Sequence, residues 1–301
     1  ISAIGQVFIL TIIGFFLAGF LGFNTFESFY LGLGLAFSST VVVVKMLLEK
    51  NDLTSLHGKL SIGILLIEDL IAITVLMIIS VGGSVLGIGF QQSLPILTLI
   101  LKAIGLFVLT FVLSKYVLEK LFDAVAKSTE LLFFTTIAWC FTFTSLAILL
   151  GFSVEIGAFL AGVALASSPY HFQIQGKIKP LRDFFLTLFF VYLGSHVKLE
   201  YLLASLPIVI LFTLCALILK PFVYMLLLGS FGFRKHTLFQ TALNLSQVSE
   251  FSLIILVVGV KAGLVSGLPL SIMASVAVLS IISSSIMISF SSKIYKKIIR
   301  I

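Results

Sequence analysis

Residues 65–71 read Leu-Leu-Ile-Glu-Asp-Leu-Ile, and they place two adjacent carboxylates, Glu68 and Asp69, in the middle of an apolar run. The run covers roughly residues 60–81, close to the length of about 20 residues that a helix needs to cross a bilayer. A charged side chain at the bilayer centre costs about 2.5–3.5 kcal/mol, so it requires a partner, a water-filled cavity or a function. Because consecutive helical residues point about 100° apart, the two carboxylates face different surroundings and need not do the same job.

The composition of the whole chain agrees with a membrane setting. Of 301 residues, 60% are hydrophobic and only 10% are charged, and the mean hydropathy is +1.25. A soluble domain cannot hide so much apolar surface in one core. The stretch 206–219 is apolar on nearly every face, whereas strands of a membrane β-barrel alternate apolar and polar residues. We therefore predict an all-α membrane protein.

Apolar runs and the polar clusters between them predict about ten spans, of which the sixth and seventh are unusually short. They cover residues 1–22, 26–46, 60–81, 93–118, 131–151, 155–168, 184–197, 201–229, 237–260 and 268–290. No linker separates a second domain, so we treat residues 1–301 as a single transmembrane domain. The first residue, Ile1, is not Met and already heads an apolar span, so we expect further N-terminal helices and allow for a C-terminal regulatory domain.

The net charge of +7 is interpreted here as a signal of topology rather than of nucleic-acid binding. The basic residues fall at alternate connections between the predicted spans: Lys45, Lys50, Lys59, Lys115, Lys120, Lys127, Lys177, Lys179, Arg182, Arg234, Lys235 and the tail 293–300. Since cytoplasmic loops carry an excess of Lys and Arg, this pattern predicts a cytoplasmic C-terminus.

Three more ionisable residues lie inside predicted spans: Lys102, Lys220 and Glu250. Lys220 either extends its ammonium toward the cytoplasmic side or forms a buried pair with Asp69. We expect Lys102 either to extend its ammonium to the membrane interface or to form a structural ion pair. The carboxylates Glu68 and Asp69 would in the simplest case only pair with these lysines and hold the helices together.

Two polar clusters interrupt the second and ninth spans. Their members are Ser38, Ser39 and Thr40 in the first cluster, and Ser246, Gln247, Ser249 and Glu250 in the second. Ser and Thr commonly line helix interfaces in membranes, so simple packing is one interpretation. The other is an inverted-repeat transporter, in which discontinuous helices in corresponding positions of the two halves meet the ion near the midplane. Neither cluster contains Gly or Pro.

The remaining polar residues favour structural roles. Ser153 and Glu155 read as a helix N-cap followed by an acid in the first turn. The four histidines lie at span ends or in connections, and both cysteines lie inside apolar runs, so we expect no metal site, disulfide or cofactor. No Gly-x-Gly-Asp motif occurs and no His lies in the middle of a span to act as a base, which argues against an intramembrane enzyme.

Buried adjacent carboxylates have a defined chemistry. Burial and a second nearby negative charge both make a carboxyl group hold a proton more firmly, so protons and cations compete for it. This competition is the chemistry of an antiporter. A cation channel or uniporter would use the same polar crossing without needing a titrating carboxylate, and coupled proton movement distinguishes the two.

The chain resembles the second class of monovalent cation:proton antiporters, which includes glutathione-gated potassium-efflux systems and bacterial sodium/proton exchangers. Four segments carry the match: 37–49, 68–72, 155–162 and 247–251. The resemblance implies a core domain with two crossed, discontinuous helices beside a dimerisation domain, and hence a homodimer in a bacterial or archaeal cytoplasmic membrane. It also implies that the first span corresponds to the family's third.

The resemblance also assigns roles to single residues. Asp69 matches the essential carboxylate, which binds a cation or a proton with help from Glu68, and Lys220 resembles the charge-compensating basic residue of a late core helix. The position of Glu68 is often Asp in electrogenic sodium exchangers, Asn in electroneutral ones and Gln in potassium-efflux members. Glu68 therefore leaves open both the choice between K+ and Na+ and the charge balance of exchange.

Overall fold

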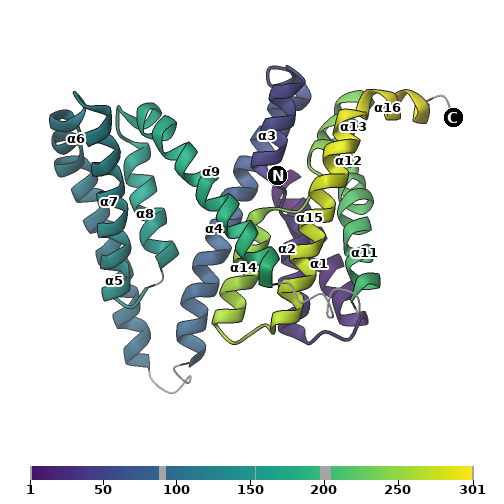
Figure 1. Ribbon diagram of the computed structural model, residues 1–301. Helices are drawn as coiled ribbons and strands as arrows, with labels where there is room; N and C mark the ends of the chain where they lie inside the picture. The colour runs from purple at the N-terminus through teal and green to yellow at the C-terminus, as the bar shows by residue number, and fades with distance from the viewer. Residues whose placement is uncertain (1, 88–92, 153, 197–204, 300–301) are drawn as a thin grey trace. The chain divides into compact units, whose positions relative to one another are not determined.

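The computed structural model describes residues 2–87, 93–152, 154–196 and 205–299, and the regular structure in these ranges is entirely helical (Figure 1). The prediction of an all-α protein is confirmed. The chain forms two compact units, which are described separately below. Unit 1 comprises residues 1–74 and 193–301, and unit 2 comprises residues 75–192.

Seven helical segments among the described residues are long and apolar enough to cross a membrane. They are Ser2–Phe20, Thr25–Glu49, Leu56–Ile79, Leu101–Val125, Thr129–Leu149, Leu206–Gly229 and Gly267–Ser289. Large apolar side chains point outward from them, such as Phe8 and Phe141, each 67% exposed. Lipid accounts for such exposure, which water would penalise. Seven of the ten predicted spans are therefore confirmed by length and composition.

The other three predicted spans differ from the structure. The sixth is the short helix α8, Val154–Ala166, and the seventh is part of α9, His171–His196, which begins well before the predicted residue 184. The first half of α9 carries several charged residues, so hydropathy alone missed a helix that continues through Pro180. The ninth is two helices, α13 and α14, rather than one. The predicted cap residue Ser153 lies outside the described residues.

Unit 1 contains most of the described helical elements. They are α1 Ser2–Phe20, α2 Thr25–Ala36, α3 Thr40–Glu49, the first part of α4 Leu56–Gly87, α11 Leu206–Leu214, the π-helical turn η2 Cys215–Leu219, α12 Lys220–Gly229, α13 Lys235–Asn244, α14 Glu250–Lys261, α15 Gly267–Ser289 and α16 Ser291–Ile299. Helix α2 packs against α1, α14 and α15, and α12 packs against α1 and α13. Nine of the twelve residues of α2 are buried, so α2 lies at the centre of this unit.

Glycines allow α2 to approach its neighbours closely. A Cβ added to Gly14 of α1 would lie 2.5 Å from Cα of Gly32 in α2, and one added to Gly32 would lie 2.4 Å from the carbonyl oxygen of Thr11. On the other side, a Cβ added to Gly259 of α14 would lie 2.4 Å from the ring of Tyr30. Small residues at such contacts are how helices gain packing energy in lipid, where the hydrophobic effect between helices is lost.

A capping box fixes the start of α2. The Asn24 side chain accepts from the backbone N–H of Glu27 at 2.9 Å, and Glu27 accepts from the backbone N–H of Asn24. The other carboxylate oxygen of Glu27 accepts from the hydroxyl of Ser266 at 2.6 Å and from its backbone N–H at 3.2 Å. Glu27 therefore joins α2 to the connection that precedes α15.

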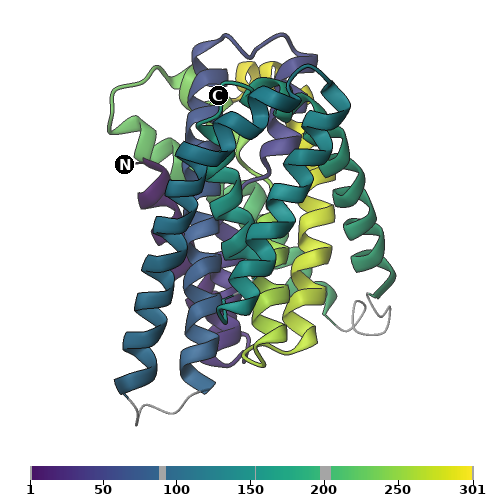
Figure 2. The ribbon, with the colours of Figure 1, turned by 90° about the vertical axis from the view of Figure 1, so that its left-hand side faces the viewer.

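Unit 2 is a smaller helical bundle. It contains the end of α4, α5 Ser93–Leu113, the π-helical turn η1 Ser114–Leu118, α6 Glu119–Val125, α7 Thr129–Leu149, α8 and most of α9. Helices α7 and α8 touch at Gly157, where a Cβ would lie 2.6 Å from the carbonyl oxygen of Phe143. The core beside this contact includes Trp139 and Phe143, whose ring centroids are 4.6 Å apart. In Figure 2, α5 and α7 run alongside α8.

The contact between α1 and α2 yields a stability prediction. Gly14→Ala forces the helices apart, because the new methyl group would overlap the backbone of Gly32, and overpacking of this kind costs about 1–3 kcal/mol. Gly19→Ala in the same helix meets only the Ser28 hydroxyl at 3.9 Å and serves as the control. We expect the thermal unfolding midpoint in detergent to fall for Gly14→Ala and to stay the same or rise for Gly19→Ala. Equal midpoints would contradict the close approach.

Candidate functional site

Two helices of unit 1 are interrupted at the polar clusters that the sequence singled out. Between α2 and α3 the backbone is extended at Phe37 and Ser39, and between α13 and α14 it is extended at Ser249. The Ser39 side chain accepts from the N–H of Val42 at 3.4 Å, and the Ser249 side chain accepts from the N–H of Phe251 at 3.1 Å. Serine caps therefore start the second helix of each pair, which explains how the interruptions form without Gly or Pro.

The two interruptions are hydrogen-bonded to each other. The backbone N–H of Ser249 donates to the carbonyl of Phe37 at 3.1 Å, and the hydroxyl of Ser38 donates to the carbonyl of Leu245 at 3.1 Å. The Gln247 amide donates to the carbonyl of Ser39 at 3.4 Å. Irregular backbone at membrane depth must find such partners inside the protein, because lipid offers none. We call residues 37–40 and 245–250 the crossing.

Lys220 supplies a positive charge to the crossing. Its side chain is fully buried, and its ammonium donates to the carbonyl of Phe37 at 2.8 Å and to the carbonyl of Gln247 at 3.1 Å. One carbonyl comes from each interruption, and Phe37 is the C-cap of α2, where the helix dipole favours a cation. The alternative in which Lys220 extends to the membrane interface is therefore wrong, because both its burial and its bonds hold it inside.

Glu68 is the carboxylate that interacts with Lys220. It is fully buried, it interacts electrostatically with Lys220, and it accepts from the backbone N–H of Ser38 at 2.8 Å. The hydroxyl of Tyr224 donates to its other oxygen. Sequence reasoning missed Tyr224, although it lies four residues after Lys220 and therefore on the same face of α12. Each oxygen of the Glu68 carboxyl group thus accepts a hydrogen bond.

Asp69 occupies a different environment. Its side chain is only half-buried, and the hydroxyl of Thr40 donates to it at 2.9 Å. Thr40 is the first residue of α3, so the carboxylate lies at a helix N-terminus, where the dipole favours negative charge. The two carboxylates therefore contact the same interruption on either side of Ser39, as expected from their 100° separation on α4.

Further buried polar residues support the crossing from neighbouring helices. Ser280 of α15 accepts from the N–H of Val248 at 3.2 Å, Asn244 donates to Ser61 of α4 at 3.2 Å, and Gln6 of α1 donates to the carbonyl of Ala36 at 2.7 Å. Sequence reasoning missed these residues, since a single polar residue in an apolar helix carries no signal of its partner.

The remaining predicted residues are placed as follows. The Ser246 hydroxyl donates to the carbonyl of Leu243 at 2.8 Å and closes the end of α13, and Glu250 is the half-buried first residue of α14. The Gln247 side-chain oxygen is buried and, within the described ranges, accepts no hydrogen bond. Lys102 belongs to unit 2 and is exposed. The described residues contain no group of three His, Cys, Asp or Glu side chains that would hold a metal ion.

The charges at the crossing yield a prediction about coupling. Glu68→Gln or Lys220→Met alone leaves the other buried charge without its partner, and removal of one member of a buried pair costs about 3–5 kcal/mol. In the double variant neither charge remains, so the loss should be smaller than the sum of the single losses. Thermal unfolding midpoints in detergent measure this difference.

The control is Lys102→Met, which removes an exposed lysine and should leave the midpoint close to that of the parent protein. Strictly additive losses for the two single variants would contradict an interaction between Glu68 and Lys220.

Comparison of the sequence with known proteins identifies a matching family model and several relatives. The family model described as "Sodium/hydrogen exchanger, transmembrane" matches residues 1–293. K(+) efflux antiporter 4 of Arabidopsis thaliana is 27% identical over 256 residues, which cover 83% of this chain and 43% of that protein. The putative K(+) efflux antiporter KefB of Alkalimonas amylolytica is 27% identical over 296 residues, covering 98% and 44%.

A third relative is the putative cation/proton antiporter YbaL of Escherichia coli (strain K12), which is 27% identical over 316 residues. The match covers 98% of this chain and 54% of that protein. The chain thus spans about half the length of the curated relatives it matches.

Proposed function

The chain belongs to the sodium/hydrogen exchanger transmembrane family, and we propose that it forms the translocation domain of a monovalent cation:proton antiporter that carries K+. Membership of this family confirms the resemblance inferred from the sequence motifs, and it is a family of transporters rather than enzymes. The observation that carries the proposal is the unequal environment of the two adjacent carboxylates. The names of the Arabidopsis and Alkalimonas relatives support K+ as the cation.

In this proposal the two interrupted helices are the crossed, discontinuous helices of an inverted-repeat antiporter. The interruption between α2 and α3 would belong to one repeat and that between α13 and α14 to the other. The hydrogen bonds from Ser249 to Phe37 and from Ser38 to Leu245 support this assignment, because they join the two interruptions directly. Transporters of this architecture bind their ions where such helices meet.

Asp69 is the proposed site of competition between cation and proton. Its carboxylate is half-buried, so an ion can reach it, whereas Glu68 is fully buried among three partners. A carboxylate oxygen is a suitable ligand for a hard cation, and the unpaired oxygen of Gln247 at the same crossing is a further neutral ligand for an ion or a water molecule. The partners of Glu68 favour charge compensation of Lys220 over ion binding.

The Glu68–Lys220 pair also bears on the charge balance. If this pair remains ionised throughout the cycle, Asp69 carries either one proton or one monovalent cation across the membrane. The loaded site then has the same net charge in both directions. We therefore propose electroneutral exchange of one K+ for one proton by alternating access.

The assembly and orientation of the protein remain part of the proposal. The basic helix α16 and the start of α13 at Lys235 lie at the same end of unit 1 (Figure 1). An excess of Lys and Arg marks the cytoplasmic side, so we place the C-terminal helix there. We retain the homodimer and the bacterial or archaeal cytoplasmic membrane as predictions from the family resemblance.

The first functional prediction concerns Asp69. In proteoliposomes, an outward K+ gradient should acidify the lumen of vesicles that contain the parent protein, as read with a trapped pH dye. Asp69→Asn should abolish this proton movement, because an amide cannot exchange a proton for a cation. Asp183→Asn, which replaces an exposed carboxylate of unit 2 bonded to Arg182, is the control and should leave transport intact.

Repeating the assay with Na+ and Li+ gradients tests the choice of cation, and K+ should give the fastest proton movement. Undiminished exchange by Asp69→Asn would rule out the proposed role of this carboxylate. A K+ flux without any proton movement in the parent protein would instead support a channel or uniporter.

The second functional prediction concerns charge movement. A K+ concentration jump applied to proteoliposomes on a solid-supported membrane should give no transport current, although the same preparation shows coupled proton movement with the pH dye. The reason is that Asp69 exchanges charges of equal sign and size. A current that grows in proportion to the pH change would contradict the one-for-one exchange. It would not contradict the proposal that Asp69 is the binding site.

A further inference from the structure

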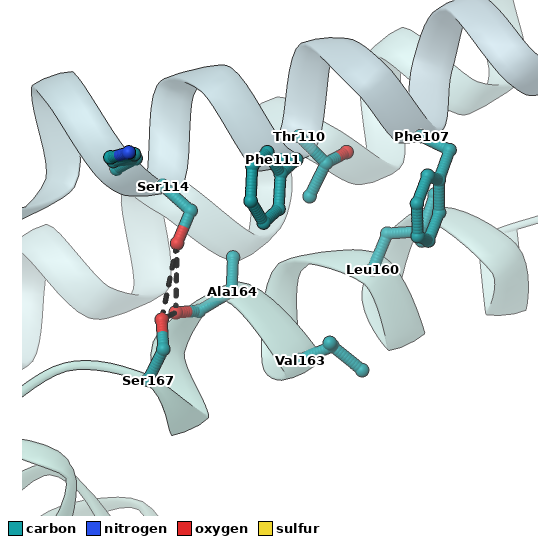
Figure 3. Close-up of a pocket in the computed structure, with 9 residues that line it drawn as sticks. Phe107, Thr110, Phe111, Ser114, Leu160, Val163, Ala164 and Ser167 are labelled. Carbon is teal, nitrogen blue, oxygen red and sulfur yellow. Dashed lines mark hydrogen bonds between the residues drawn. The ribbon is translucent and has the colours of Figure 1, made fainter.

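Unit 2 contains a groove of about 330 Å³ between helices α5 and α8 (Figure 3). This volume lies in the range of roughly 300–1,000 Å³ that is typical of small-molecule sites. The groove is lined on the α5 side by Phe107 and Phe111 and on the α8 side by Leu160 and Val163. The rings of Phe107 and Phe111 are 60% and 65% exposed, so the groove opens onto the surface of this unit. Its walls are therefore mainly apolar.

Polar groups gather at one end of the groove. The hydroxyls of Ser114 and Ser167 lie 3.2 Å apart, and both donate to the carbonyl of Ala164, at 3.2 and 2.7 Å. Figure 3 shows these three residues beyond the apolar part formed by Phe107 and Leu160. The bonds to Ala164 shape this end of the groove, and the bond from Ser114 joins η1 to α8.

Lys115 also lines the polar end, and its side chain is exposed. It is the second residue of the π-helical turn η1, and π-turns within helices occur frequently at functional sites. The Lys115 ammonium lies 5.6 Å from the ring centroid of the neighbouring Tyr116. Lysine beside tyrosine is typical of the level at which lipid headgroups meet the hydrocarbon core. The groove thus has one cationic end and an otherwise apolar length.

We propose that this groove binds an acyl chain of an anionic phospholipid whose headgroup phosphate is held by Lys115. The apolar walls match the hydrocarbon chain, and the ammonium matches the negative headgroup. The site belongs to unit 2 and does not depend on the residues of the crossing. It is therefore separate from the proposed transport chemistry.

Native mass spectrometry of the full-length protein, delipidated in detergent and titrated with a defined lipid, tests the proposal. We expect phosphatidylglycerol to bind more tightly than phosphatidylcholine, by about fivefold for one lysine at the membrane surface. Lys115→Ala should remove this preference. Lys120→Ala, which replaces an exposed lysine that does not line the groove, should retain it.

A second variant tests the apolar part of the groove. Val163→Trp fills it from α8 and should reduce the binding of both lipids, whatever the headgroup. Equal affinity of the parent protein for the two lipids, equal effects of Lys115→Ala and Lys120→Ala, or unchanged binding by Val163→Trp would each overturn the proposal.

A cysteine placed in the groove tests whether another part of the protein occupies it. In membranes, and in a background whose native cysteines are replaced by alanine, Val163→Cys should react with a lipid-soluble maleimide about as fast as Val108→Cys. These two positions are matched in exposure, at 50% and 52%. A disulfide between two copies at position 163 would show that a second copy fills the groove. Protection of position 163 alone would show that another segment covers it, and either result would overturn the proposal.

Discussion

The rest of unit 1 depends on the ammonium of Lys220, which lies between two interrupted helices and binds a carbonyl from each. An interruption in lipid exposes backbone groups that water cannot reach, and each unsatisfied group costs several kcal/mol. At the crossing these groups bond to each other, to Lys220, to the Glu68 carboxylate, to the Gln247 amide or to a serine hydroxyl. The interruption is therefore stable only while the crossing is assembled, and the packing of α2, α13 and α12 becomes a single interdependent arrangement.

The buried lysine requires a second charge, and Glu68 meets that requirement. Its carboxylate accepts hydrogen bonds from Ser38 and Tyr224 and interacts electrostatically with Lys220. Tight contacts at Gly14, Gly32 and Gly259 keep α2 close to α1 and α14, where the crossing needs it. Asp69, one residue further along α4, is by contrast a half-buried carboxylate, bonded to the Thr40 hydroxyl. The carboxylate that interacts with Lys220 and the proposed exchange site are thus adjacent residues of α4.

The two proposed sites lie in different units of the chain. Unit 1 holds the buried charges of the crossing, whereas unit 2 has an apolar surface that includes the groove beside Lys115. A lipid bound in the groove would contact α5 and α8 directly.

The sequence by itself determined the membrane class, seven of the spans, the polar residues at the two interruptions and the position of two adjacent carboxylates, Glu68 and Asp69, inside a span. These properties belong to single segments, because hydropathy and the cost of a charge in lipid are local. It did not determine whether the two polar clusters interrupt their helices or only pack between them, that α9 begins at His171, or which role each carboxylate is suited to. Those outcomes depend on partners far away in the chain: Lys220 binds a carbonyl 183 residues before it, and Tyr224 reaches a carboxylate 156 residues before it. Only the tertiary structure brings such groups together, since a polar residue in an apolar helix does not specify which distant group will satisfy it.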